Sequence, residues 1–164
     1  MEKFVEVNIV GLIMDQVSKS PVMVLKALNE KKVIPIWIGL NEANAIALEL
    51  ENVSSPRPMT HDLIKNIMNV LEARVEKVII TDLIESTYYA ELYIHRGGEV
   101  QIIDCRPSDA IVVALKNKAK IFVSEQVIGA SLIGDFFSNL LDSDEKIDSW
   151  FNSLTPDDFG KVEQ

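Results

Sequence analysis

Apolar and polar residues alternate with a period of two along the first part of the chain. This alternation is typical of β-strands with one buried face. The three strands are predicted over residues 3–14, 22–28 and 33–38. Phe4, Val7 and Ile9 cannot all share one face of a regular strand, which favours a bulge or a second buried face. Pro35 lacks a backbone N–H, so the third strand is expected at a sheet edge or at a bulge. The chain therefore opens with an antiparallel meander.

After Gly39 the apolar residues recur at helical spacing, and strands then return as a block. The predicted elements are helices over 40–50 and 60–73, strands over 74–84, 87–96 and 99–105, a helix over 108–118 and a strand over 120–123. Gly97-Gly98 is a strong two-residue hairpin signal. Strands and helices occur in blocks and do not alternate strictly. The predicted class is therefore α+β with a mixed, largely antiparallel sheet, in the order three strands, two helices, three strands, one helix and one strand.

The pattern changes after Val123. We expect residues 1–128 to form one α+β domain and residues 129–164 to form a helical, acidic C-terminal extension. Its short amphipathic stripe contains Ile147, Trp150, Phe151 and Leu154. Such a stripe predicts packing against the domain or against a partner.

Polar side chains gather at the starts of two predicted helices. The two segments are Pro56-Arg57-Pro58-Met59-Thr60-His61-Asp62 and Asp104-Cys105-Arg106-Pro107-Ser108-Asp109. Each contains an Arg-Pro pair, then a hydroxyl residue, then an aspartate, and each leads into an apolar run. Thr60 and Ser108 are predicted N-caps, and the aspartates lie where the helix dipole favours negative charge.

Composition and charge narrow the classes of function. The 164 residues are 48% hydrophobic and 25% charged, which is ordinary for a globular protein. The net charge of −9 argues against broad electrostatic adhesion to nucleic acid, although a local basic site or a metal-bridged site remains compatible with it. The single cysteine, Cys105, the missing apolar run of membrane length and the absence of a signal peptide predict a cytoplasmic protein without membrane contact. No Walker loop, dinucleotide fingerprint, zinc-ligand spacing or nucleophile elbow occurs.

Several blocks together resemble the bifunctional nuclease (BFN) domain family. The matching blocks are Ile36-Trp37-Ile38-Gly39, Glu42-Ala43, Ala45-Ile46-Ala47, Pro56-Arg57-Pro58, Thr60-His61-Asp62-Leu63, Tyr89-Ala90, Arg106-Pro107-Ser108-Asp109-Ala110-Ile111 and Ile121-Phe122-Val123. The resemblance spans residues 5 to 128. It implies a compact α+β domain, sometimes assembled as an oligomer, and for some members the degradation of both RNA and DNA. Some members carry a UvrB/UvrC-like motif at the C-terminus, and the short tail here lacks its basic, Glu-rich helical pair.

Phosphodiester hydrolysis needs an activated water, positive charge on the phosphoryl oxygens and help for the leaving oxygen. Arg57 and Arg106 are candidate phosphate clamps because a planar guanidinium meets phosphate with two hydrogen bonds. His61 is a candidate general acid or base. The full candidate set is Arg57, His61, Asp62, Arg106 and Asp109 for catalysis, and Glu42, Asp62, Asp104 and Asp109 as oxygen ligands for Mg²⁺ or Mn²⁺.

Each of these assignments has a structural alternative. Arg57 could pair with Asp109, and Arg106 with Asp62, so that the two helix starts hold each other. For Cys105, an inert buried thiol is the interpretation favoured over a nucleophile, because no Cys-His pairing is visible.

The leading hypothesis is a nuclease with RNA and DNA as substrates, little sequence preference, divalent-metal assistance and a tendency to form homo-oligomers. The second is a non-enzymatic binding or scaffold domain that could form a dimer, with the Arg-Pro segments as a structural network and the tail docking a partner. A third is a sensor of small anionic ligands at the same helix starts.

Overall fold

The computed structural model describes residues 3–15, 18–29 and 32–130. Its strands are β1 (Phe4–Met14), β2 (Pro21–Ala27), β3 (Val33–Trp37), β4 (Arg74–Ile84), β5 (Thr87–Arg96), β6 (Glu99–Cys105) and β7 (Lys120–Ser124). Its helices are α1 (Leu40–Leu50), α2 (Thr60–Val70), α3 (Pro107–Asn117) and α4 (Glu125–Ala130). The element order therefore follows the prediction closely, with α4 following the predicted final strand.

The seven strands form one sheet in the order β3-β2-β1-β7-β4-β5-β6. Five of the neighbouring pairs are antiparallel, and β4 with β7 is the parallel pair. The predicted α+β class with a mixed, largely antiparallel sheet is confirmed. β7 lies in the middle of the sheet, where it joins the β1–β2–β3 meander to the β4–β5–β6 meander.

Local sequence signals explain how the strands begin, bend and turn. The pairing of β1 with β2 shifts register between Ile9 and Gly11, which marks a bulge. This bulge lies after Phe4, Val7 and Ile9, and Phe4 differs in phase from Val7 because it is exposed while Val7 is buried. Pro35 lies in β3, an edge strand, where a missing N–H leaves no ladder bond unmade. Gly97 and Gly98 both have positive φ, at 59° and 86°, as a tight hairpin between β5 and β6 requires.

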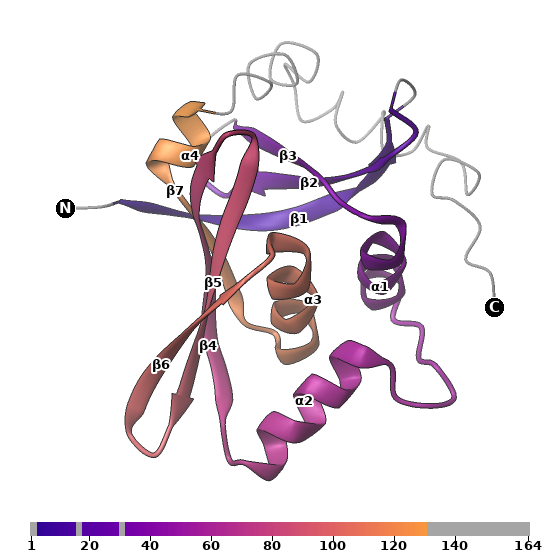
Figure 1. Ribbon diagram of the computed structural model, residues 1–164, viewed down its shortest axis with the longest axis vertical. Helices are drawn as coiled ribbons and strands as arrows, with labels where there is room; N and C mark the ends of the chain where they lie inside the picture. Colours follow the sequence, from indigo (N-terminus) through magenta and orange to yellow (C-terminus); the bar gives the residue numbers. More distant parts are fainter. Residues whose placement is uncertain (1–2, 16–17, 30–31, 131–164) are drawn as a thin grey trace.

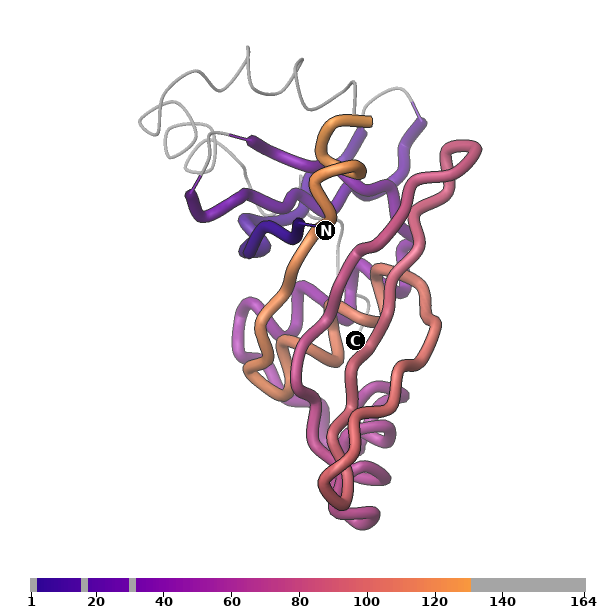
Figure 2. Tube along the Cα trace, turned by 90° about the vertical axis from the view of Figure 1, so that its left-hand side faces the viewer, coloured from indigo at the N-terminus to yellow at the C-terminus, as the bar shows by residue number. Residues whose placement is uncertain are grey.

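Three helices cover one side of the sheet. α1, α2 and α3 lie together beside the strands in Figure 1, and α4 lies across β4 and β7 from α3, as Figure 2 also shows. α3 is the most deeply placed helix, and its residues Ala110 to Ala114 are all buried. Because α3 packs against β4, β5 and β7 as well as against α1 and α2, it fixes where the other two helices can present their polar ends.

The predicted helix caps at Thr60 and Ser108 are wrong. Met59 is the N-cap residue of α2, and Thr60 is already helical. Arg106 is the N-cap of α3, with Pro107 at the first helical position, where its fixed φ and missing N–H cost nothing. Ser108 is consequently a buried helical residue. α2 also ends at Val70, three residues earlier than predicted, because Glu72 adopts a left-handed conformation with φ of 56°.

The predicted C-terminal extension over 129–164 lies almost wholly outside the described residues, which end at Ala130 within α4. The division into a domain over 1–128 and this extension therefore stays a prediction. Among the helices in the described part of the chain, none is long and apolar enough to cross a membrane.

Candidate functional site

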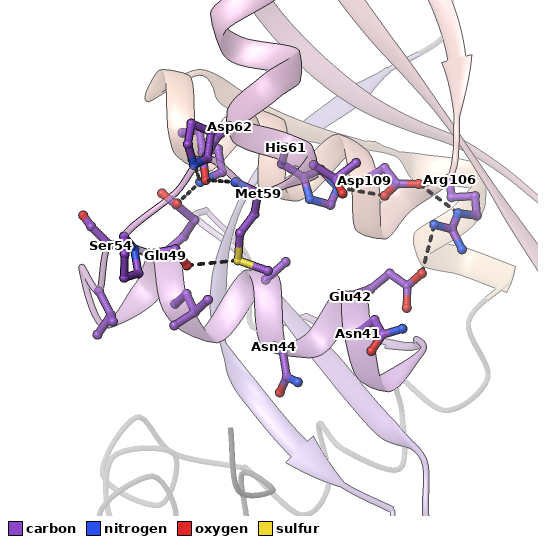
Figure 3. Close-up of a pocket in the computed structure, with 18 residues that line it drawn as sticks. Asn41, Glu42, Asn44, Glu49, Ser54, Met59, His61, Asp62, Arg106 and Asp109 are labelled. Atoms are coloured by element: carbon purple, nitrogen blue, oxygen red, sulfur yellow. Dashed lines mark hydrogen bonds and ion pairs between the residues drawn. The ribbon is translucent and has the colours of Figure 1, made fainter. Parts of the chain in front are cut away.

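An open cavity of about 770 Å³ lies where α1, α2 and α3 meet (Figure 3). The 51–59 loop between α1 and α2 forms part of its wall. The charged or ionisable residues that line it are Glu42, Glu49, His61, Asp62, Arg106, Asp109 and Lys116. They come from three helices, so the packing of α1 and α2 onto α3 creates the site.

One wall of the cavity carries a continuous chain of four interacting side chains (Figure 3). His61 Nε2 lies 2.9 Å from Asp109 Oδ1. The other oxygen of Asp109 accepts a 2.8 Å hydrogen bond from Arg106 Nε, and Arg106 Nη2 lies 2.9 Å from Glu42 Oε1. Each step joins opposite charges or a charge and an imidazole, so each residue fixes the orientation of the next.

The electrostatics of this chain determine how His61 is held. Burial favours the neutral form of Asp109, but hydrogen bonds from Arg106 and His61 outweigh burial and lower the pKa of Asp109 below its ordinary value. Asp109 is therefore a carboxylate at neutral pH and can only accept hydrogen bonds. Neutral His61 must then carry its proton on Nε2, which leaves Nδ1 as the basic nitrogen. The His61 side chain is 13% exposed, so this nitrogen belongs to a group largely shielded from bulk water.

A second group of side chains in the cavity is organised by Lys116 of α3. Its ammonium donates to Asp62 Oδ1 at 2.6 Å and also pairs with Glu49 of α1. The hydrogen bond from Lys116, followed by the 2.9 Å bond from the Met59 backbone N–H, lowers the pKa of Asp62. Burial opposes the charge on Lys116, yet bonds to Asp62 and Glu49 raise its pKa overall. Lys116 thus ties the first turn of α2 to α1.

A model of the bifunctional nuclease domain matches residues 23–134. The chain belongs to this family. An uncharacterized protein of Mycobacterium tuberculosis is 39% identical over 162 residues, covering 94% of this chain and 97% of that protein. The family resemblance predicted from the matching sequence blocks is confirmed.

Two plant relatives of the bifunctional nuclease family match a shorter segment. Bifunctional nuclease 1 of Oryza sativa subsp. indica is 29% identical over 97 residues, which is 57% of this chain and 29% of the rice protein. Bifunctional nuclease 2 of Arabidopsis thaliana is 32% identical over 95 residues, which is 56% of this chain and 29% of that protein. The shared part is therefore a domain-sized portion of these larger nucleases.

Five of the predicted site residues of this family member come together at the cavity. They are Glu42, His61, Asp62, Arg106 and Asp109. Arg57 is exposed in the loop before α2, and it is absent from the cavity lining although its neighbours Pro56 and Pro58 contribute to it. Asp104 is exposed on β6, paired with Glu91 of β5, and does not line the cavity.

The predicted crossed ion pairs are wrong. Arg106 binds Asp109, three residues along its own helix, and Glu42, whereas Asp62 binds Lys116. The N-cap position of Arg106 explains the local pair, because Nε reaches the carboxylate in the first turn of the same helix. Arg57 forms no ion pair with any residue in the described ranges.

Sequence reasoning missed Lys116 and Glu49. Lys116 is in the last turn of α3, where a basic side chain normally answers the helix dipole at the surface. Glu49 falls seven residues after Glu42, and this shared helix face was the available signal that both could reach the same cavity. Pairing with Lys116 depends on how α1, α2 and α3 pack, which no local pattern encodes.

A hard divalent cation requires several oxygen ligands gathered around one point. Within residues 3–15, 18–29 and 32–130, no group of three or more His, Cys, Asp or Glu side chains is placed to hold a metal ion. Glu42 and Asp109 are bridged by Arg106, and Asp62 and Glu49 by Lys116. The carboxylates thus form two cation-bridged pairs, and this arrangement does not fit a ready-made Mg²⁺ or Mn²⁺ site.

Proposed function

We propose that this protein is a nuclease that hydrolyses phosphodiester bonds of RNA and DNA with little sequence preference, at the cavity between α1, α2 and α3. The observation that carries the proposal is the His61–Asp109 hydrogen bond in an open cavity, in a member of the bifunctional nuclease family. A histidine oriented by a carboxylate is a common acid–base arrangement in hydrolysis.

Under this proposal, water is the nucleophile. DNA lacks the 2′-hydroxyl group, so one mechanism for both polymers cannot use that group to attack phosphorus. His61 Nδ1 takes a proton from the water as its oxygen bonds to phosphorus. The bond from phosphorus to the leaving oxygen breaks, and that oxygen takes up a proton from solvent water, while protonated His61 returns its proton to solvent. Asp109 holds the imidazole in the tautomer that this step requires.

Arg106 is the proposed phosphate-binding cation inside the cavity. It donates one hydrogen bond each to Asp109 and Glu42, which leaves three of its five N–H groups for a ligand. The side chain is 65% exposed, so these groups are accessible to a phosphate. Arg57, on the exposed loop between Pro56 and Pro58, is proposed to contact the nucleic acid backbone outside the cavity.

The excess of negative charge in the cavity favours assistance from a divalent cation. Of the described residues that line the cavity, four are carboxylates and two carry permanent positive charge. A polyanionic substrate would therefore meet an excess of negative charge, which Mg²⁺ or Mn²⁺ would reduce. Since the carboxylates do not form a ready-made site, no step of the reaction is assigned to the ion.

The test is cleavage of labelled single-stranded RNA and duplex DNA by rigorously purified protein, with Mg²⁺, Mn²⁺ or EDTA. We expect His61→Ala to lower the rate by about 10²–10⁴-fold, the usual contribution of a general acid or base. His95→Ala is the matched control, because His95 lies on β5 opposite Arg74 and does not line the cavity. Equal rates for wild type and the His61→Ala protein, both folded by circular dichroism, would show that the cavity is not the nuclease site.

We also propose an interaction role, because one surface of α2 is unusually apolar. Its exposed large side chains are Leu63, Ile67, Val70 and Leu71, of which Val70 is 82% exposed. The remaining exposed positions from residue 63 to 71 are asparagines, so no fully exposed position in this run is charged. Two copies can therefore bury these apolar side chains against each other, although each chain has a net charge of −9. A second copy of the chain is the proposed occupant.

This second proposal is tested by the molar mass of the protein in solution. Light scattering should give a dimer for the wild type and a monomer for Ile67→Asp combined with Val70→Asp, with unchanged circular dichroism. A monomeric wild type would remove the dimer from the proposal without touching the nuclease assignment.

A further inference from the structure

Gly39 is a glycine that its backbone conformation does not explain. It is the N-cap residue of α1, with φ of −74° and ψ of 161°, an extended conformation that any residue adopts. The freedom of glycine at positive φ is therefore not used here. The absence of a side chain at residue 39 is explained instead by the limited space beside its Cα atom.

That space is occupied by the carboxyl group of Glu42. A Cβ atom built on Gly39 would overlap Glu42 Oε2, at a separation that real Cβ contacts do not show. Glu42 lies in the first turn of α1, and its side chain folds back over Gly39 with one carboxyl oxygen. Its other oxygen, Oε1, lies 2.9 Å from Arg106 Nη2. The missing side chain at residue 39 therefore accommodates one end of the carboxylate that holds Arg106.

We propose that Gly39 is a positioning residue of the site: by lacking a Cβ atom it lets Glu42 take the conformation that orients the Arg106 guanidinium. The inference rests on the proposed nuclease function for its consequence in catalysis. The geometry of Glu42 and Arg106 that carries it is independent of that function.

Gly39→Ala should leave the fold intact. The added methyl group meets the end of a flexible side chain, so rotation of Glu42 relieves the overlap without moving the backbone. Arg106 then loses one of its two carboxylate partners and keeps Asp109. A guanidinium of Arg106 held in the wrong orientation should slow the chemical step more than it weakens substrate binding. We therefore expect kcat to fall about tenfold, with a smaller change in KM.

A double-mutant cycle tests whether Gly39 acts through Glu42. We expect Gly39→Ala and Glu42→Ala each to lower kcat by a similar factor, and the double variant to be no slower than Glu42→Ala alone. Gly129→Ala in α4 is the matched control, because a Cβ atom there meets nothing within 4 Å. If Gly39→Ala lowered kcat further in the Glu42→Ala background, or left kcat unchanged in the wild-type background, the inference would be wrong.

A spectroscopic readout separates this inference from the proposed function. The side-chain Nε–H resonance of Arg106, assigned by its loss in Arg106→Lys, reports how firmly the guanidinium is held. We expect its hydrogen exchange to become faster in Gly39→Ala and in Glu42→Ala to a similar extent, and to stay unchanged in Gly129→Ala. If the wild type cleaves nothing, the nuclease proposal fails while this measurement still tests the role of Gly39. Unaltered exchange in Gly39→Ala would overturn that role.

Discussion

His61 Nε2 lies 2.9 Å from Asp109 Oδ1, although 48 residues separate the two positions in the chain. His61 is in the first turn of α2 and Asp109 is in the first turn of α3, so their contact shows that these two helix starts face one another. The two Arg-Pro segments of the sequence thus converge on one hydrogen bond, and this bond supports the acid–base role proposed for His61.

Asp109→Asn should nearly abolish cleavage while leaving the fold intact. The side-chain amide can donate to His61 Nε2, which would stabilise the tautomer with its proton on Nδ1 and remove the proposed base. We expect a loss of roughly 10²-fold or more, comparable to the loss of a general base. Initial rates on labelled RNA and DNA measure it, and Asp82→Asn, on the exposed side of β4, is the control. Cleavage by Asp109→Asn at the wild-type rate would contradict the assigned role of the pair.

Lys116→Met should destabilise the fold. Removal of the ammonium leaves Asp62 and Glu49 partly buried and without their common partner. We expect the free energy of unfolding to fall by about 1–2 kcal/mol, the range for a lost charge-assisted hydrogen bond at partly exposed groups. Urea denaturation measures the change. Lys120→Met is the control: Lys120 pairs with Glu6 at the surface with 67% of its side chain exposed, and such pairs contribute at most about 1 kcal/mol.

Stability should decrease in acid because two site carboxylates have a lowered pKa. The pKa values of Asp62 and Asp109 lie below the ordinary 3.8, so the unfolded chain binds protons more tightly than the folded one. Their contribution is complete above that ordinary value and is lost as the pH falls through the folded values. The free energy of unfolding, measured by urea denaturation between about pH 5 and pH 2, should therefore fall. Asp62→Asn should flatten the fall, and an equally steep slope in this variant would contradict the prediction.

Cys105 should react slowly with thiol reagents in the native state. Burial, followed by the negative charges of Asp104 and Asp109, raises the pKa of its thiol to about 11 from 9.0. The reactive thiolate is then about a hundredfold rarer at neutral pH than for a thiol of ordinary pKa. Absorbance with a disulfide reagent should show slow reaction of the native protein and fast reaction in urea. Equal rates would mean that the thiol is accessible and ionised as in an unfolded chain.

Local sequence patterns predicted most of the fold. The period of two specifies the strands, Pro35 specifies an edge strand, and Gly97-Gly98 specifies a hairpin. Each of these signals acts over only a few residues. The errors lie where two local preferences compete, as when Pro107 takes the first helical position and moves the start of α3 ahead of Ser108.

The candidate site was only partly predictable. His61 and Asp109 could be named because each follows an Arg-Pro pair, yet their direct contact depends on the packing of α2 against α3. The same packing brings Lys116 to Asp62, so Arg106 pairs with Asp109 and not with Asp62 as predicted. Tertiary geometry decides which of several nearby carboxylates a basic side chain binds. Sequence spacing alone does not determine that geometry.

The central position of β7 has a consequence for how the chain folds during synthesis. β7 pairs with β1 on one side and with β4 on the other, yet residues 120–124 leave the ribosome after both meanders. Until then β1 and β4 are open edges, each able to pair with the wrong strand. The two halves of the sheet consequently join late, and the domain is expected to complete its folding as one unit once this strand is available.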